Sequence, residues 1–222
     1  MARRTPASVT RAIAEFRAAS DLDPRFTAAF AREAYAYGLF IDWAWTYPGA
    51  AAPELLARAT GLASEAVRQD SSSAEAWLAW AYAQLLSAPS DPARALPGFE
   101  RALSLNPADA ESLHQYGQAL MSIGRYSDAA GAYHAALALD PTRAMTLVPL
   151  AAISSRNHDE EEARRWIDSA VAVGPAIPYA WSVRATQRNR AGDHSGAIED
   201  ARRALEIDSS YEIPARGALA VA

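Results

Sequence analysis

The chain has 222 residues, half of them apolar, and a formal net charge of −5 at pH 7. The absence of cysteine excludes disulfides, thiolate metal sites and cysteine nucleophiles, and the mixed charges leave no basic stripe for a nucleic acid partner. No window approaches the roughly 18 uncharged apolar residues of a membrane span, and no apolar segment follows the basic first residues, so we expect a cytoplasmic protein with no membrane partner.

The first predicted element is a lone helix near residues 7–19, within an N-terminal segment 1–26. The pair Thr5-Pro6 is a helix-start signal. Ala12, Phe16 and Ala19 have the spacing of the second helix of a helical hairpin, and no first helix precedes them. The segment is therefore expected to be an N-terminal half-repeat.

The next segment, 27–73, is expected to be one long, atypical hairpin. The turn signals at Asp23 and Asp70 are 47 residues apart, 13 more than the later period of 34. Two antiparallel helices, each lengthened by six or seven residues, would accommodate the difference. Aromatic side chains point all round the first of these helices, and they either cover the N-terminal part of the array or reach a partner. The aromatic residues are Tyr35, Tyr37, Phe40, Trp43, Trp45 and Tyr47, of which Trp43 and Trp45 form a candidate second interaction surface.

Four further hairpins follow at 74–109, 110–143, 144–177 and 178–211, and 212–222 begins a partial C-terminal helix. Asn106-Pro107, Asp140-Pro141 and Gly174-Pro175 recur at 34-residue intervals. Antiparallel helices approach closely only where one of them presents a small side chain. Two alanine columns keep the register that such hairpins need, namely Ala59, Ala95, Ala129, Ala163, Ala197 and Ala66, Ala102, Ala136, Ala170, Ala204. The chain is therefore predicted to be all-α, built of tandem helix-turn-helix repeats.

Local signals divide each repeat into helix, turn and helix. Glycine suits the turn inside a hairpin, and serine, aspartate, asparagine or proline suits a helix start. Turns are predicted at Gly124 and Gly192, and helix starts at Pro53, Ser72 with Glu75, Asp91-Pro92, Asn157 with Glu160, and Ser209 with Glu212.

The stretch from Ala110 to Pro141 resembles a tetratricopeptide repeat at nearly every signature column. The columns that carry the resemblance are Leu113, Tyr116, Gly117, Leu120, Gly124, Tyr126, Ala129, Tyr133, Ala136 and Pro141. The resemblance implies that residues 1–222 form a single right-handed α-solenoid, a TPR-like superhelix whose first helices line a concave groove. It also implies a recognition scaffold, although the family serves many pathways and its signature does not encode the ligand.

The groove face of each first helix follows the i, i+3, i+4, i+7 spacing. This face is neutral and largely apolar, which predicts a groove for an extended or helical peptide. The candidate contacts are Arg32, Tyr35, Leu78, Tyr82, His114, Gln115, Gln118, Met145, Val148 and Tyr179. The alternative is that successive hairpins curl tightly enough for these residues to pack on one another.

Several positions depart from the family pattern. Some members hold a C-terminal carboxylate with Lys, Asn and Arg on the groove face, where this chain has mostly Ala, Leu, Gln and Val, which argues against that ligand. Pro149 falls inside a predicted first helix and should bend it. Arg184 and Arg188 replace an apolar residue and a tyrosine, and we expect them to pair with Asp200 or Asp168.

Neither a metal site nor an enzyme is expected. The acids that follow Asn157 suit a helix start by charge alone, and the four histidines, His114, His134, His158 and His194, lie in separate hairpins. Glu111 with His114 is the one pair worth testing for acid–base chemistry. The sequence thus predicts a protein–protein interaction scaffold without cofactor. The alternative is a structural or self-associating spacer, or a regulatory segment of a larger signalling protein.

Overall fold

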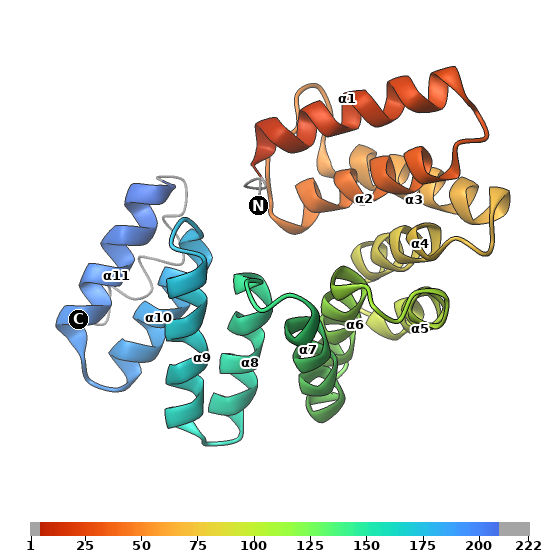
Figure 1. Ribbon diagram of the computed structural model, residues 1–222. Helices are drawn as coiled ribbons and strands as arrows, with labels where there is room; N and C mark the ends of the chain where they lie inside the picture. The colour runs from red at the N-terminus through yellow and green to blue at the C-terminus, as the bar shows by residue number, and fades with distance from the viewer. Residues whose placement is uncertain (1–4, 209–222) are drawn as a thin grey trace. The chain divides into compact units, whose positions relative to one another are not determined.

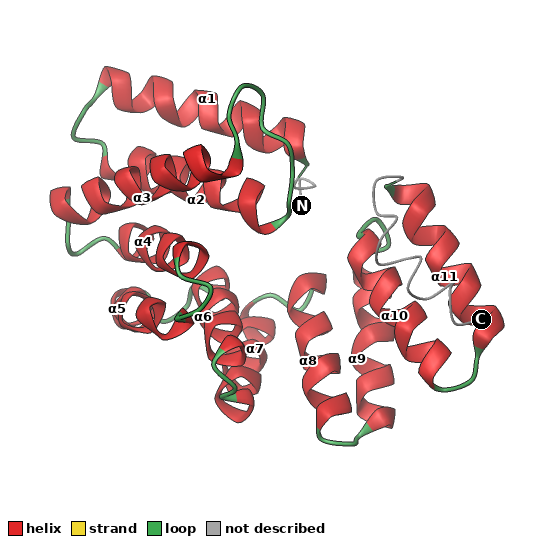
Figure 2. Cartoon of the chain, turned by 180° about the vertical axis from the view of Figure 1, so that it is seen from behind, coloured by secondary structure: helices red, strands yellow, loops and turns green. Residues whose placement is uncertain are grey.

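The computed structural model describes residues 5–208, and within that range it contains helices and turns but no strand (Figure 2). The all-α prediction is confirmed. The chain divides into two compact units, Met1–Ala132 and Tyr133–Ala222, with the boundary inside one helix. In chain order the helices are α1 (Pro6–Leu22), α2 (Thr27–Asp42), α3 (Ala52–Gln69), α4 (Ala74–Ser87), the short 3-10 helix η1 (Pro92–Ala95), α5 (Leu96–Leu105), α6 (Ala110–Ser122), α7 (Tyr126–Leu139), α8 (Ala144–Arg156), α9 (Glu160–Val173), α10 (Pro178–Arg190) and α11 (His194–Ile207).

In the first unit, consecutive helices pack on one another along the chain. Helix α1 packs against α2, α2 against α3 and α4, and α4 against α5 (Figure 1). The alanine columns Ala59 with Ala66 and Ala95 with Ala102 are fully buried on α3 and at η1 and α5. Because alanine lets two helix backbones approach closely, these columns determine where the hairpins touch. Their predicted structural role is confirmed.

An aromatic cluster forms the core of the N-terminal part of this unit. Tyr37 and Phe40 of α2 and Tyr82 of α4 are fully buried, together with Ile13 of α1 and Leu55 of α3. Large aromatic side chains bury more apolar area than any aliphatic residue and favour edge-to-face contacts. The aromatic residues of α2 therefore cover the N-terminal part of the array, as one of the two interpretations of the sequence proposed.

The extra residues of segment 27–73 lie partly in a loop. Helix α2 has 16 residues and α3 has 18, against 13 in α6 and 14 in α7. The expectation of six or seven added residues in each helix is wrong, because α2 and α3 are longer by only three and four. The remainder lengthens the loop 43–51. Its first part turns sharply, since Ala44 has a positive φ of 50°.

In the second unit, α8 packs against α9, α9 against α10, and α10 against α11 (Figure 1). Leu147 and Val148 of α8 meet Ile167 and Val171 of α9 in a buried apolar cluster. Pro149 lies inside α8 as predicted, and the helix runs from Ala144 to Arg156. The residues on both sides of the proline are buried, so packing against α9 holds the helix together despite the missing N–H donor.

Most helix starts lie where the sequence predicts them, with two corrections. Thr5 and Ser8 form a reciprocal capping box at α1. The N-cap of α4 is Ser73 and not Ser72, and its hydroxyl accepts from the Ala76 N–H. The N-cap of α9 is Asp159 and not Asn157, which is instead the C-cap of α8. The start proposed at Ser209 with Glu212, and the partial helix 212–222, lie outside the described residues.

One backbone position recurs in the turns of three hairpins. Gly124, His158 and Gly192 stand 34 residues apart and have φ values of 81°, 62° and 85°. This left-handed conformation costs glycine little but strains a residue with a Cβ. The predicted turns at the two glycines are confirmed, and His158 is a strained member of the same set.

Candidate functional site

Polar side chains join the first helices of three successive hairpins in the first unit. The Arg32 guanidinium of α2 donates to both carboxylate oxygens of Glu75 on α4, with Nη2 2.7 Å from Oε1 and Nε 3.1 Å from Oε2. These side chains remain about half exposed, at 54% and 47%. An ion pair of this kind adds little to stability, but it presents charged groups that a ligand can reach.

Tyr35 connects α2 to α6 across the same surface. Its hydroxyl donates to Glu111 Oε1, and the Gln115 Nε2 donates to the Tyr35 oxygen over 2.9 Å. The ring of Tyr35 also stacks on that of Tyr82, with the centroids 4.7 Å apart. A surface residue of α2 is thereby fixed by α4 and α6 together.

Tyr82 carries the network on to the end of α2. Its hydroxyl donates to Asp42 Oδ2 over 2.9 Å. The Asp42 side chain remains exposed, but surrounding protein atoms remove part of its hydration and raise its pKa; the Tyr82 hydrogen bond opposes the rise, and the charge of Glu111 adds to it. Burial also raises the pKa of Tyr82 well above its usual value. The Tyr82 phenol is thus neutral at neutral pH and donates its proton to the Asp42 carboxyl group.

Gly38 lets the Tyr82 ring lie directly against α2. A Cβ at position 38 would lie 2.6 Å from Cε1 of Tyr82 and 3.2 Å from a methyl carbon of Leu86. These distances are shorter than a van der Waals contact. The small residue is therefore a condition for the position of the phenol.

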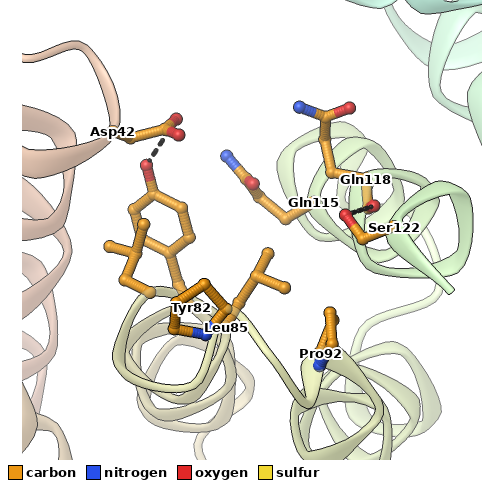
Figure 3. Close-up of a pocket in the computed structure, with 9 residues that line it drawn as sticks. Asp42, Tyr82, Leu85, Pro92, Gln115, Gln118 and Ser122 are labelled. Carbon is orange, nitrogen blue, oxygen red and sulfur yellow. Dashed lines mark hydrogen bonds between the residues drawn. The ribbon is translucent and has the colours of Figure 1, made fainter.

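A hollow of about 230 Å³ lies between α2, α4, the loop after α4, and α6 (Figure 3). Figure 3 shows the Asp42 carboxylate, the Tyr82 hydroxyl and the Gln115 amide toward one end, with Leu85 and Pro92 on the opposite side. The lining residues are Asp42, Tyr82, Leu85, Leu86, Pro89, Pro92, Gln115, Gln118 and Ser122. Sequence reasoning found only Tyr82, Gln115 and Gln118 of this set. The sequence contains one signal for the other lining residues. Pro89 and Pro92 lie in the segment that makes the predicted hairpin 74–109 longer than the 34-residue period.

The structure corrects the expected exposure of the predicted groove. Leu78, Tyr82, His114, Gln115 and Val148 are buried, because neighbouring helices of their own unit cover them. Tyr35, Gln118 and Met145 are half-buried, whereas Arg32 and Tyr179 are exposed, Tyr179 at 42%. The expectation that this face exposes its apolar side chains is therefore wrong for Leu78 and Val148. The role of each of these residues in ligand binding remains a prediction. The residues that reach solvent are mainly polar or aromatic.

The two tryptophans predicted as a second surface lie on the loop 43–51. Their rings are in contact, with centroids 4.9 Å apart and planes inclined at 59°, and both are half-buried. Trp45 also meets Phe40 edge to face at 5.7 Å, so it belongs to the edge of the aromatic core. Trp43 is the more available of the two for another molecule.

In the second unit, the predicted pairing of Arg184 and Arg188 is confirmed. Arg184 donates to both oxygens of Asp200 at 2.8 Å and to Asp168 at 3.1 Å, and Arg188 lies 3.3 Å from Asp200. The Asp200 side chain is 3% exposed and that of Arg184 is 15% exposed. These ions fill the space between α10 and α11, which explains why charged residues replace the apolar ones of the family pattern.

No group of three or more His, Cys, Asp or Glu side chains within residues 5–208 is placed to hold a metal ion. Glu111 and His114, the pair considered for acid–base chemistry, differ in environment: His114 is buried, and Glu111 Oε1 accepts hydrogen bonds from Tyr35 and, at 3.4 Å, from Gln115. These bonds give the carboxylate a structural role in joining α2 to α6. None of the described helices is both long and apolar enough to cross a membrane.

Hairpins of two short helices, packed in tandem through alanine columns, define the class of α-helical repeat proteins. A family model for the tetratricopeptide repeat matches residues 110–143. Residues 110–143 thus match a tetratricopeptide repeat, where the sequence resemblance places one.

Solved structures of similar fold come from the same class. TTC0263, a thermophilic TPR protein of Thermus thermophilus, is 15% identical over 86% of this chain and 98% of its own, with a TM-score of 0.69. YrrB, described as a TPR protein with an unusual peptide-binding site, is 16% identical over 92% of this chain and 97% of its own, with a TM-score of 0.56. Yeast Tom70 is 17% identical over 97% of this chain but 44% of its own, with a TM-score of 0.64. These likenesses establish the fold, and no curated protein matches the sequence.

Proposed function

We propose that the chain is a protein-interaction scaffold that binds an extended segment of a partner along the first helices α2, α4 and α6. The observation that carries the proposal is the side-chain network linking these three helices, from Arg32 and Glu75 to Tyr35, Glu111 and Gln115. Consecutive first helices presenting fixed polar groups beside a hollow are a surface suited to a peptide backbone and its side chains.

Two further points support a peptide ligand. A pre-organised surface binds more tightly, because less side-chain freedom is lost on association, and Tyr35 is already held by partners on α4 and α6. YrrB, a protein of similar fold, is described as having a peptide-binding site. In the second unit, considered by itself, Met145 and Tyr179 remain proposed contacts for a partner.

The proposal is tested with a matched pair of charge reversals. Random dodecapeptides displayed on phage are selected on the wild-type protein, and the enriched peptides are then titrated against Glu75→Arg and Glu65→Arg. Both glutamates pair with an arginine at the surface, but Glu75 lies on the first helix α4 and Glu65 on the second helix α3. We expect Glu75→Arg to weaken binding about tenfold and Glu65→Arg to leave it within about twofold.

Equal binding to both variants would place the ligand elsewhere, and a selection that enriches no peptide would contradict the scaffold function. Circular dichroism of both variants provides the folding control. Each substitution repels one exposed arginine, so any effect on stability should be small and similar in the two.

A self-associating spacer is the second candidate, favoured by the half-buried Trp43 in contact with Trp45 in the loop 43–51. Trp43→Ser is the appropriate variant, because Trp45 contributes to the core. If the spacer is correct, light scattering will show oligomers that form with rising concentration and disappear in this variant. A monomer at all concentrations would reject it.

A further inference from the structure

The hollow of the first unit is apolar along its wall and polar at one end, so it is complementary to an amphipathic side chain. Leu85, Leu86, Pro89 and Pro92 supply apolar wall, and Asp42, Tyr82 and Gln115 supply hydrogen-bonding atoms. Figure 3 shows these polar groups together toward the α2 end of the hollow. A ligand group that fits must therefore be apolar along its length and polar at its tip.

The polar end offers acceptors. Asp42 has a second carboxylate oxygen besides the one that holds Tyr82, and the Tyr82 oxygen donates its only proton to Asp42, so its lone pairs remain for another donor. Gln115 uses its Nε2 for Tyr35 and Glu111, and within residues 5–208 no hydrogen bond reaches its Oε1. The oxygens of Asp42 and Tyr82 and the side-chain amide of Gln115, from α2, α4 and α6, thus lie toward one end of the hollow (Figure 3).

The charge at this end is negative. Asp42 lines the hollow, and Glu111 is near enough for its charge to act on Asp42. No arginine lines the hollow among the described residues, and Arg32 on the same surface is paired with Glu75. A cationic group entering the hollow would offset both carboxylates and replace hydration that Asp42 has already lost.

We propose that this hollow binds the side chain of a lysine on an extended partner segment. The proposal rests on the proposed function and names the side chain that the scaffold selects. The four methylenes of lysine lie along Leu85, Leu86 and Pro92, and the ammonium donates to Asp42, Tyr82 and Gln115. An ammonium carries three N–H donors around a point, which matches three acceptors from three helices, whereas the guanidinium of arginine needs a planar, forked acceptor.

The test uses a defined probe, the blocked pentapeptide acetyl-Ala-Ala-Lys-Ala-Ala-amide, whose only amine is the lysine side chain. The protein contains no lysine, so the ¹³Cε signal of a labelled probe is observed without overlap, and the side-chain amide of Gln115 reports the site. We expect saturable shifts of both signals at pH 7. The norleucine analogue, which keeps the methylenes and loses the charge, should bind at least about tenfold more weakly.

The matched variants are Asp42→Asn and Asp21→Asn. Both remove one acidic charge from the same unit, but Asp21 is exposed on α1, away from the hollow. Asp42→Asn retains an acceptor for the Tyr82 hydroxyl, so it is expected to fold. It should weaken the lysine probe about tenfold, while Asp21→Asn should leave it within about twofold.

Binding should also weaken as the pH falls through the raised pKa of Asp42, because a bound cation favours the ionised carboxylate. Tyr35, Tyr82 and Glu111 are the other titratable groups near it. Equal weakening by the two variants, or equal binding of an arginine probe, would overturn the assignment to lysine. If the lysine probe fails while display-selected peptides still depend on Glu75, the inference falls and the proposed function stands; if neither binds, both fall.

Discussion

The α2–α3 and α10–α11 hairpins of this chain have different cores. Between α2 and its neighbours, large aromatic side chains exclude water around Tyr37 and Phe40. Between α10 and α11, the buried apolar cluster is small, with Ala185 and Ala201 and the partly buried Leu205, and ions of Arg184 and Asp200 fill space beside it. The repeat geometry therefore requires small residues at the alanine columns but accepts either apolar or ionic packing beside them.

The difference has a physical consequence. Apolar burial is nondirectional and gains free energy in proportion to the area removed from water. A buried ion pair is directional, and removing one partner leaves an uncompensated charge. The α2 hairpin should respond mainly to changes in volume, and the α10 hairpin mainly to changes in charge.

The largest expected effect is that of Phe40→Ala. The ring is fully buried and contacts Trp45 and Tyr47, so the substitution should lower the free energy of unfolding by about 4 kcal/mol. Urea denaturation followed by circular dichroism measures the change. The control is Phe26→Ala, at a phenylalanine that is 47% exposed, which should cost less than about 1 kcal/mol. Equal losses of stability in the two variants would contradict the claim that apolar burial dominates the stability of the α2 hairpin.

Asp200→Ala should follow, with a loss of about 3 kcal/mol, because it leaves Arg184 and Arg188 without their shared buried partner. Asp168→Ala removes a half-exposed carboxylate from the same Arg184 and should cost less than about 1 kcal/mol. Amide hydrogen exchange should show that the loss of protection is concentrated in α10 and α11. An Asp200→Ala variant as stable as wild type would show that the ions contribute nothing to this hairpin.

His158→Gly tests the turn instead of the core and is expected to stabilise the protein. Position 158 has a φ of 62°, whereas the equivalent turn between α10 and α11 already has Gly192. Relief of the left-handed strain should exceed the entropy lost by glycine, for a gain of about 0.5 to 1 kcal/mol. Asn157→Gly, at an adjacent residue with a φ of −81°, should instead destabilise. The two thermal midpoints decide the sign.

The smallest effect concerns Asp42, at the edge of the aromatic core. Because its pKa is raised in the folded state, ionisation favours unfolding, and this cost is present at pH 7 and disappears below the ordinary aspartate pKa of about 4. Asp42→Asn should therefore stabilise the protein at pH 7, by less than about 0.5 kcal/mol since the side chain is exposed. The difference should vanish at pH 3. A variant that is less stable than wild type at pH 7 would contradict the pKa argument.

The sequence predicts the repeat architecture well, because the features that define it are local and periodic. Alanine columns, glycine turns and the ionic replacement at Arg184 and Arg188 each follow from spacing along a helix. The same reasoning failed for Leu78 and Val148, which it placed at the surface and which lie in the cores of their units. Helical periodicity assigns a residue to a face, but not how closely the next hairpin covers that face.

The hollow could not be predicted for a related reason. Asp42 is the last residue of α2, and Pro89 lies in the loop after α4, so neither belongs to a repeating column. The inserted residues of the loop 43–51 were also assigned to helices, because sequence spacing gives the number of inserted residues but not their conformation. The residues of the candidate site that do not belong to a repeating column are therefore those whose position could not be predicted from sequence spacing.

The contact between Gly38 and the Tyr82 ring implies a rule for the divergence of this protein. A methyl group at position 38 and a phenol at position 82 cannot occupy the same space, since the Cβ would lie 2.6 Å from the ring. A lineage that gains a side chain at position 38 must therefore also lose the large ring at position 82, and with it the hydroxyl that holds Asp42. Positions 38 and 82 are expected to covary among descendants of this sequence, and the acidic hollow is expected to be inherited or lost together with them.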